Sequence, residues 1–597
     1  MLPSAYVEAP DLTPPTPQTK DAYGSFDRKL PAVGIQSLQE EDHNPQSLPR
    51  TIYPPLILED HPVDERLLIK AIVVGAGITG ITAGVLLPAK GGTWHSNTYP
   101  GVKCDVPSHV YQSTFSPNKS WTENYSRGAE IKAYWKGVAT KYSVWQYLQL
   151  NSEILSARWS DEKAKWAVHI KQTDPETGES NTITDEAEFL ITGTGRFSSP
   201  RLPDIPGIND YKGKVIHTGA WDKAFDPTGK NLALIGNGAS GLQILPELQK
   251  VATRVDHYTR NPTWVAGTLG GEKLSRTVPI AEDLKGTWKS NNASYHVYRK
   301  ELESAAWTRF AIVEKGGATN AAARAEFEQL MGIRLGGKKN ELLPLVLPGF
   351  APNCRRLTPG PGYLEAVAQE NVKYIRTPIK RFTETGLKTV DGRERIVDAV
   401  ICATGADHAG GDPGFPDTYL GMTTADYPNL IFIGGPNAGS GFAGTVPHAV
   451  ETQVTYAAKI LRKVSSQRIR TITPSKAAVL DFRAYCESFF PTTVLSEGCS
   501  SWYNNQVKGG RIVAVWPGSG AHVNYVRRDV RWEDFEYTYH NLQGNRFGYL
   551  GNGWTTRDVA AKEGRSDEVD FTEYLKEEAG DGIGVDLRGY HEAWWEV

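Results

Sequence analysis

The stretch Leu67-Leu-Ile-Lys-Ala-Ile-Val-Val-Gly-Ala-Gly-Ile-Thr-Gly80 joins an apolar run to three glycines. A second stretch, Asn231-Leu-Ala-Leu-Ile-Gly-Asn-Gly-Ala-Ser-Gly241, repeats the pattern. Each apolar run is typical of a buried strand, and the G-x-G-x-x-G spacing after it is typical of a turn that opens a helix. Glycines at this turn let the backbone approach a pyrophosphate, and the helix N-terminus adds N–H donors and partial positive charge. Two copies therefore predict two dinucleotide sites.

Other apolar runs in the chain also end in glycine. They are Phe189-Leu-Ile-Thr-Gly-Thr-Gly195, Ala399-Val-Ile-Cys-Ala-Thr-Gly405 and Leu430-Ile-Phe-Ile-Gly-Gly435. Repeated strand–glycine–helix units are characteristic of doubly wound parallel sheets. The predicted fold class is α/β, with two Rossmann-like dinucleotide-binding domains, a helical insertion and a C-terminal extension.

Composition narrows the classes of partner. A chain of 597 residues exceeds the size of one hydrophobic core, so two or three domains are expected. A net charge of −3 and a pI near 6.5 argue against nucleic acid or an anionic membrane as the main partner. No apolar run reaches the roughly 18–20 residues that span a bilayer, and the N-terminus lacks a secretory pattern. The five cysteines form no C-x-x-C, so a reducing, cytoplasmic setting is expected. No metal site is predicted, and the sequence leaves the oligomeric state open.

The order of the motifs suggests domain boundaries. The predicted segments are a partly disordered N-terminal extension rich in Pro and acidic residues (1–66), the first part of the first dinucleotide-binding domain (67–205), the second dinucleotide-binding domain (206–384) with a helical insertion at about 275–342, the second part of the first dinucleotide-binding domain (385–475), and an aromatic-rich C-terminal region (476–597).

The second glycine motif also carries a signal for its dinucleotide. About 20 residues after the glycines, a Rossmann site places an acid on the ribose or an arginine on a 2′-phosphate. Arg260 stands there and favours NADPH, while Asp256 leaves room for NADH.

Three motifs resemble those of the Baeyer–Villiger monooxygenases, especially the fungal branch that acts on secondary-metabolite ketones. Tyr211-Lys-Gly-Lys-Val-Ile-His-Thr-Gly-Ala-Trp-Asp222 keeps the family spacing G-x-x-x-H-x-x-x-W, with Tyr211 where most members have Phe. Residues 91–105 match G-G-x-W-x-x-x-x-Y-P-G-x-x-x-D, and Asn353-Cys-Arg-Arg-Leu-Thr-Pro-Gly360 resembles the family's basic pair. The resemblance covers about residues 67–560. It implies an enzyme that uses FAD, NADPH and O2 to insert an oxygen atom beside a ketone carbonyl, giving an ester or lactone.

The resemblance also implies roles for particular residues. Arg356 would be the catalytic cation that stabilises negative oxygen, Asp105 would orient it, and His217 would position the cofactor near the domain hinge. Arg355 would contact the NADP phosphate, and Trp502 the dinucleotide. The remaining predicted cofactor-binding residues are Gly75, Gly77, Gly80, Gly92, Thr93, Trp94, Asn97, Tyr99, Val106, Tyr111, Gly236, Gly238, Ala239, Ser240, Gly241 and Arg260.

The first dinucleotide unit departs from the family pattern. Only ten residues, Ile81 to Lys90, separate Gly80 from Gly91, and no Asp or Glu occurs from Arg66 to Cys104. The strand that should end in a ribose-binding acid is therefore missing. Three explanations are open: a segment absent from the sequence as read, which we favour; another segment that fills the gap; or weak FAD binding in an inactive protein.

Three other functions share parts of this pattern. A flavin monooxygenase that oxidises amine or sulfur has both glycine motifs, but not Asp105, the Arg355–Arg356 pair and Trp221 in combination. A dithiol reductase needs a redox cysteine pair, and the sequence predicts none. The missing strand would fit a non-catalytic relative.

Overall fold

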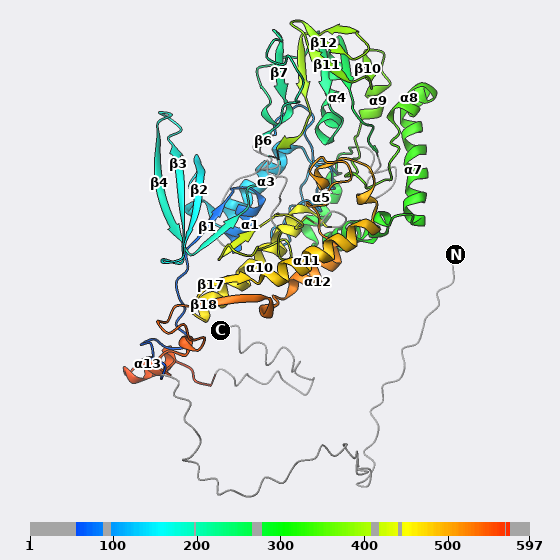
Figure 1. Cartoon of the computed structure of the whole chain (residues 1–597). Coiled ribbons are helices and arrows are strands. Elements are labelled where there is room, and N and C mark those ends of the chain that lie inside the picture. Colours follow the sequence, from blue (N-terminus) through cyan, green and yellow to red (C-terminus); the bar gives the residue numbers. More distant parts are fainter. Residues whose placement is uncertain are drawn as a thin grey trace, which may run out of the picture. The chain divides into compact units, whose positions relative to one another are not determined.

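Two parallel sheets organise the protein in the computed structural model (Figure 1), which describes residues 55–86, 97–195, 197, 199–265, 277–407, 417–439, 444–566 and 569–572. The first sheet has the order β1-β5-β16, and the second has the order β10-β9-β8-β14-β7. Their bounds are β1 (Ala71–Val74), β5 (Phe189–Thr192), β16 (Leu430–Phe432), β7 (Lys214–His217), β8 (Asn231–Ile235), β9 (Arg254–Tyr258), β10 (Val372–Ile375) and β14 (Ala399–Cys402). The predicted α/β fold class is confirmed.

The two predicted glycine-rich units begin these sheets in the same way. The strand β1 leads into α1 (Ile78–Leu86), and β8 leads into α4 (Ala239–Val251). The strand β8 lies between β9 and β14, and four of its five residues are buried. By contrast β1 pairs only with β5 among the described residues, and all four of its residues are only partly buried. The edge of β1 is where a second strand of a Rossmann unit would pair, in agreement with the short sequence after Gly80.

One strand differs from the predicted domain boundaries. Residues from 385 onward were assigned to the FAD-binding domain, yet β14 pairs in parallel with β7 and β8 of the second sheet. All four residues of β14 are buried, so it fits between two strands of either domain. A uniformly apolar sequence indicates that a strand is buried, but it does not indicate which sheet the strand joins. The assignment of Ala399–Cys402 to the FAD-binding domain is therefore corrected.

Two short strands mark the connections between the two sheets. The strand β6 (Ser199–Pro200) pairs antiparallel with β15 (Ala406–Asp407). The chain leaves β5 through the first of these and leaves β14 through the second. The two connections therefore run side by side.

Smaller antiparallel sheets complete the architecture. They are β2 (Ser152–Ser160), β3 (Lys165–Thr173) and β4 (Ser180–Ala187); β11 (Ile379–Phe382), β12 (Gly386–Thr389) and β13 (Glu394–Ile396); and β17 (Ile469–Pro474) with β18 (Phe535–Tyr539). The helices not yet named are α3 (Gly128–Lys141), α5 (Glu282–Ser290), α6 (Asn292–Trp307), α7 (Ala318–Leu335), α8 (Lys339–Val346), α9 (Tyr363–Val367), α10 (Val446–Ser466), α11 (Lys476–Phe489), α12 (Gly520–Arg528) and α13 (Thr556–Lys562).

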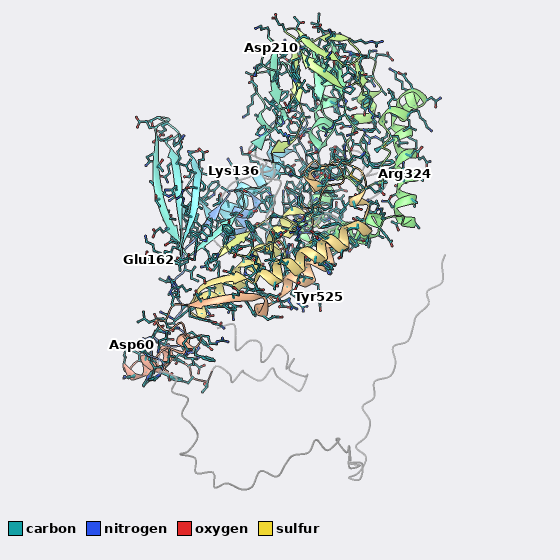
Figure 2. The ribbon with its side chains drawn as sticks, in the orientation of Figure 1. Asp60, Lys136, Glu162, Asp210, Arg324 and Tyr525 are labelled. Carbon is teal, nitrogen blue, oxygen red and sulfur yellow. A yellow bond between two sulfur atoms is a disulfide. The ribbon has the colours of Figure 1, made fainter. Side chains whose placement is uncertain are left out.

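The segment predicted as a helical insertion contains α5, α6, α7 and the start of α8. The helix α7 packs on the second domain through apolar residues, including Phe327 and Met331. Arg324, labelled in Figure 2, lies over the ring of Trp264, 5.6 Å from its centroid. The insertion therefore shares the core of the second sheet.

The aromatic-rich C-terminal region packs on the first sheet. Phe482, Trp516 and Phe535 belong to the same buried cluster as Phe189 and Ile431. Phe482 stacks on Trp516 with ring centroids 5.4 Å apart. The high aromatic content of this region thus serves the core of the first domain.

The described end of the N-terminal extension contacts the C-terminal region. The Val63 amide donates to the Trp554 carbonyl at 2.8 Å, and the Thr556 amide donates to Asp64 at 2.7 Å. All of the helices and strands given above lie within one unit, Ile57–Val597. Within the described ranges, no helix has the length and apolar character needed to cross a bilayer.

Candidate active site

The first glycine of each predicted motif occupies the same kind of turn. Gly75 has φ +109°, and a Cβ there would lie 2.3 Å from the Gly193 carbonyl oxygen. Gly236 has φ +107°, and a Cβ there would lie 2.4 Å from the Ala403 carbonyl oxygen. Both positions require glycine. Any other residue would have a strained backbone, and its Cβ would collide with the backbone just after the neighbouring strand. The two units therefore share the same backbone conformation at this turn.

The second turn leaves room in front of a helix N-terminus. A Cβ on Gly238 would meet nothing within 4 Å, whereas a Cβ on Gly241 would lie 2.2 Å from the Gly236 carbonyl oxygen. The helix α4 begins at Ala239 and continues through Ser240. Open space beside free helical N–H groups suits a phosphate. In the first unit, the Ile81 amide donates to the Gly77 carbonyl at 2.9 Å, so α1 starts at that glycine in the same manner, with Gly80 inside it.

Two arginines lie near each other beside the second unit. Arg260 is exposed just after β9, and Arg355 is half-buried with its guanidinium 5.1 Å from the Phe350 ring centroid. Burial lowers the pKa of Arg355, and the positive charge of Arg260 lowers it further. Two cations held close together favour an anion of high charge.

Asp256 does not lie at a ribose position. It is buried within β9, 1% exposed, and its carboxylate contacts the Arg254 guanidinium at 3.2 Å. Burial raises its pKa, although Arg254 and Arg395 oppose the shift. Asp256 therefore does not support the NADH alternative, because its carboxylate lies in the interior of the sheet.

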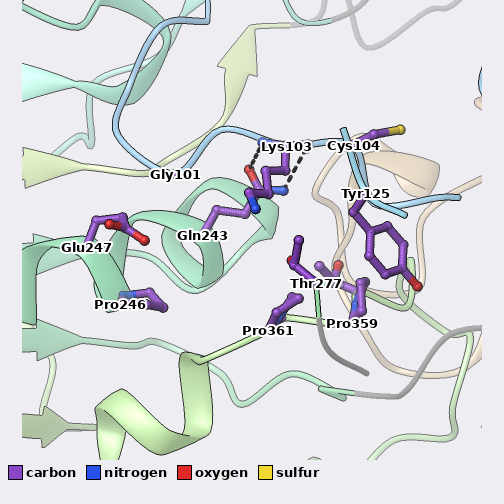
Figure 3. Close-up of a pocket in the computed structure, with 12 residues that line it drawn as sticks. Gly101, Lys103, Cys104, Tyr125, Gln243, Pro246, Glu247, Thr277, Pro359 and Pro361 are labelled. Atoms are coloured by element: carbon purple, nitrogen blue, oxygen red, sulfur yellow. Dashed lines mark hydrogen bonds between the residues drawn. The ribbon is translucent and has the colours of Figure 1, made fainter. Parts of the chain in front are cut away.

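The loop after residue 96 is fixed to α4 of the second unit. The Tyr99 hydroxyl donates to Gln243 Oε1 at 2.8 Å, and Gln243 Nε2 donates to the Lys103 carbonyl at 2.9 Å. Figure 3 shows Gln243 and Lys103 joined in this way at the wall of a pocket that Thr358 also lines. Gln243 was not predicted; its place in the first turns of α4, two residues after Gly241, was the available signal.

The other predicted residues of this loop are placed as follows. Val106 and Tyr111 are half-buried against a cluster that includes Cys104, Trp121 and Trp135. Asn97 is half-buried at the start of the described loop. Gly92, Thr93 and Trp94 lie outside the described residues. The predicted flavin contacts of the loop remain predictions.

Asp105 and Arg356 form a bidentate ion pair. Arg356 Nε donates to Asp105 Oδ2 at 2.7 Å, and Nη2 donates to Oδ1 at 2.9 Å. Burial favours a raised pKa for the Asp105 carboxyl, but the charge and hydrogen bonds of Arg356 outweigh it, and the pKa lies below its usual range. The Asp105 charge raises the pKa of Arg356. The pair is thus ionised, and one edge of the guanidinium is locked in orientation.

Tyr503 completes the surroundings of Arg356. It is 2% exposed. Burial raises the pKa of its phenol to about 12, while the charge and hydrogen bonding of the adjacent Arg356 oppose the rise. The phenol is therefore neutral and lies against the cation. Nothing in the sequence points to Tyr503 beyond its place next to Trp502.

The residues of the Tyr211–Asp222 motif make local contacts around β7, and the predicted cofactor-positioning role of His217 remains a prediction. The Tyr211 hydroxyl donates to the Val397 carbonyl at 2.8 Å, and a Cβ on Gly213 would lie 2.3 Å from that hydroxyl oxygen. His217 ends β7, and its Nδ1 accepts from the Gly219 amide at 2.9 Å. Burial lowers the pKa of His217, so the ring is neutral and shapes the turn after β7. Trp221 packs against the core of the second domain.

A disulfide joins two segments of the site. Cys354 and Cys499 are bonded, with their Cα atoms 6.2 Å apart. The sequence predicts no redox cysteine pair, and it does not predict this disulfide. The residues are 145 apart in sequence, so no C-x-x-C pattern announces them. Trp502, on the same segment as Cys499, packs edge-on against Phe197 with ring centroids 5.7 Å apart.

Comparison with known families agrees with this geometry. A family described as Flavin-binding monooxygenase-like matches residues 110–276. The FAD-binding monooxygenase tazF of Aspergillus terreus is 31% identical over 524 residues, covering 81% of this chain and 91% of that protein. A Baeyer–Villiger monooxygenase of Streptomyces coelicolor is 30% identical over 505 residues, covering 78% of this chain and 91% of that protein.

Solved structures show the same fold. An oxidised steroid monooxygenase bound to NADP aligns with a TM-score of 0.66 at 23% identity, covering 79% of this chain and all of that chain (100%). Cyclohexanone monooxygenase from Rhodococcus sp. Phi1 bound to NADP+ aligns with a TM-score of 0.66 at 23% identity, covering 79% of this chain and 99% of that one.

Proposed function

Because this chain belongs to the Baeyer–Villiger monooxygenase family of FAD-dependent enzymes, we propose that it converts a ketone into an ester or lactone with NADPH and O2. The ketone belongs to secondary metabolism and is a polyketide or terpenoid. This choice of substrate rests on the resemblance of the sequence motifs to fungal members of the family.

The observation that carries the proposal is the Asp105–Arg356 pair. Insertion of oxygen beside a carbonyl passes through states with negative charge on oxygen. A guanidinium suits this role because it does not deprotonate and has five N–H donors, of which Asp105 takes two. The Arg356 side chain is 38% exposed, so it can be reached from outside the pair. Asp105 holds the fork in place, and Tyr503 lies beside it.

The second unit fits NADPH. The open space at Gly238 and the start of α4 suit the pyrophosphate. Arg260 and Arg355 suit a 2′-phosphate, because both present positive charge at the end of β9 and Asp256 is already engaged by Arg254. Trp502 would pack on the dinucleotide, as the family resemblance implies.

The first unit fits FAD in part. Gly75, Gly77 and the start of α1 suit its pyrophosphate, and FAD when bound supplies the activation of O2. The acid that would hold its ribose is absent from Arg66 to Cys104. Loss of one charged hydrogen bond costs about 1.5–3 kcal/mol, or roughly ten- to a hundredfold in affinity. FAD therefore binds more weakly here than in an unshortened unit.

The test is a substrate panel with excess FAD and NADPH. The panel contains cyclic and aryl ketones, a thioether and a tertiary amine, and products are identified by mass spectrometry. An ester or lactone from a ketone supports the proposal. Oxidation of the thioether or amine with no ester from any ketone would replace it with a heteroatom oxygenase.

A further inference from the structure

Two segments that are far apart in the sequence meet at the Cys354–Cys499 disulfide. Cys354 is 1% exposed and Cys499 is 2% exposed. A second contact lies next to the bond, where the Ala351 amide donates to the Glu497 carboxylate at 2.9 Å. The bond therefore joins two loops that already pack against each other.

Each segment carries candidate site residues immediately beyond its cysteine. Arg355 and Arg356 follow Cys354, and Ser500, Trp502 and Tyr503 follow Cys499. Arg355 Nη2 donates to Ser500 Oγ at 3.4 Å, a long and weak hydrogen bond. Tyr503 lies against Arg356. Because the non-covalent contacts of Arg355 across this junction are weak, the covalent bond one residue away is the stronger restraint on its backbone.

We propose that Cys354 and Cys499 are positioning residues, whose disulfide holds the arginine loop on the C-terminal segment and so sets the affinity for NADPH. This inference rests on the proposed function, because that function assigns Arg355 to the NADP phosphate. The oxidised pair presents Arg355 in a fixed place, and the reduced pair leaves the loop less restrained.

Each sulfur of the disulfide lies near a backbone carbonyl oxygen. The Cys499 sulfur is 3.0 Å from the Cys354 carbonyl oxygen, and the Cys354 sulfur is 3.7 Å from the Glu497 carbonyl oxygen. On reduction the two sulfurs move apart, and each thiol has a hydrogen-bond acceptor nearby. Formation of the bond transfers two electrons and two protons from the thiols to a low-molecular-weight disulfide such as glutathione disulfide, which becomes two thiols. The other cysteines, Cys104, Cys402 and Cys486, are free and buried.

The experiment compares Cys354→Ser, Cys499→Ser and the double variant with the parent and with Cys486→Ser as the matched control. We expect each of the three to raise the dissociation constant for NADP+, measured by calorimetry, and the Michaelis constant for NADPH by about five- to tenfold. The constant for the ketone should change less than twofold. The double variant should match the single variants, because the two sulfurs act as a unit. Cys486→Ser should behave as the parent, and circular dichroism at the assay temperature checks that every variant is folded.

A redox titration separates positioning from general stability. After equilibration with glutathione disulfide, the denatured parent should expose three thiols rather than five. Dithiothreitol should give the parent the nucleotide affinity of the variants, and reoxidation should restore it, while the variants stay unchanged. Five thiols after oxidation, or equal NADP+ affinities in both redox states, would overturn the proposal. If NADP+ affinity shifts as expected while no ketone yields an ester, the positioning role stands and the proposed function fails.

Discussion

Arg356 donates two hydrogen bonds to the Asp105 carboxylate, although the two residues are 251 positions apart in the chain. Asp105 lies in a loop of the first domain, and Arg356 comes after the helical insertion of the second domain. The pair therefore forms only when both halves of the protein are folded and in contact. This makes it a sensitive point for testing the mechanism.

Replacing Arg356 should separate ester formation from nucleotide oxidation. Arg356→Ala removes the cation that stabilises negative oxygen, so ester formation should fall by at least about a hundredfold. NADPH oxidation should remain measurable, because Arg355 and Arg260 are intact. Product yield and NADPH consumption are measured in the same reaction. Arg393→Ala, on an exposed arginine between β12 and β13, is the control. An unchanged yield in Arg356→Ala would remove this residue from the mechanism.

Replacing Arg260 should affect one nucleotide and not the other. Arg260→Ala removes a charge that pairs with the 2′-phosphate, so the Michaelis constant for NADPH should rise about ten- to a hundredfold. The constant for NADH should change little, because NADH lacks that phosphate. Steady-state kinetics with both nucleotides checks this, with Arg393→Ala again as the control. Equal effects on both nucleotides would contradict the phosphate assignment.

Lengthening the first unit should improve flavin binding. Insertion of a helix and a strand ending in Glu between Lys90 and Gly91 supplies the missing acid and a partner for the edge of β1 that no described strand covers. FAD affinity should rise about ten- to a hundredfold. The measurement is bound FAD per chain against free FAD. An insertion of the same length with Gln in place of Glu isolates the charge, and no gain in either form would show that the gap is tolerated.

Stability should fall in mild acid because of His109. Its ring is 1% exposed among Trp288, Tyr295 and Tyr298. Burial lowers its pKa to about 3, and Arg299 and Lys285 act in the same direction. The unfolded chain binds a proton near pH 6.5 and the folded one does not. The stabilisation is therefore complete above pH 6.5 and is lost progressively as pH falls toward 3, by about 2 kcal/mol between pH 7 and pH 5.

Denaturant unfolding at pH 7 and pH 5 measures this loss. His109→Gln should lower stability at pH 7 but show a smaller loss between the two pH values than the parent. His296→Gln, on an exposed histidine of the neighbouring helix α6, should show the loss of the parent. An identical loss in His109→Gln and the parent would assign the acid sensitivity to other groups.

The sequence predicted what depends on local pattern. Gly75 and Gly236 could be identified because each follows an apolar strand at a fixed spacing, and the turn tolerates no side chain. Asp105 and Arg356 could be identified only through the resemblance of their loops to a family, since an isolated acid or arginine has no readable partner.

The features that were missed depend on contacts between distant segments. Gln243 fixes the loop of Tyr99 from another domain, and the Cys354–Cys499 bond spans 145 residues. The strand β14 is apolar on both faces and could have joined either sheet. Asp256 matched a ribose-binding acid in sequence, but it lies inside β9, two residues before the strand ends. Such positions are decided by tertiary packing, which a single sequence does not display.

We propose that the protein inserts one oxygen atom of O2 into a ketone beside Arg356. The most direct measurement supplies FAD-saturated protein with NADPH, isotopically labelled O2 and the best ketone of the panel, and follows the label by mass spectrometry. We expect one labelled oxygen atom in the ester or lactone of the parent, and none above background in Arg356→Ala. An unlabelled ester or lactone, or recovery of unchanged ketone, with NADPH consumed and flavin bound in the parent, would contradict this proposal.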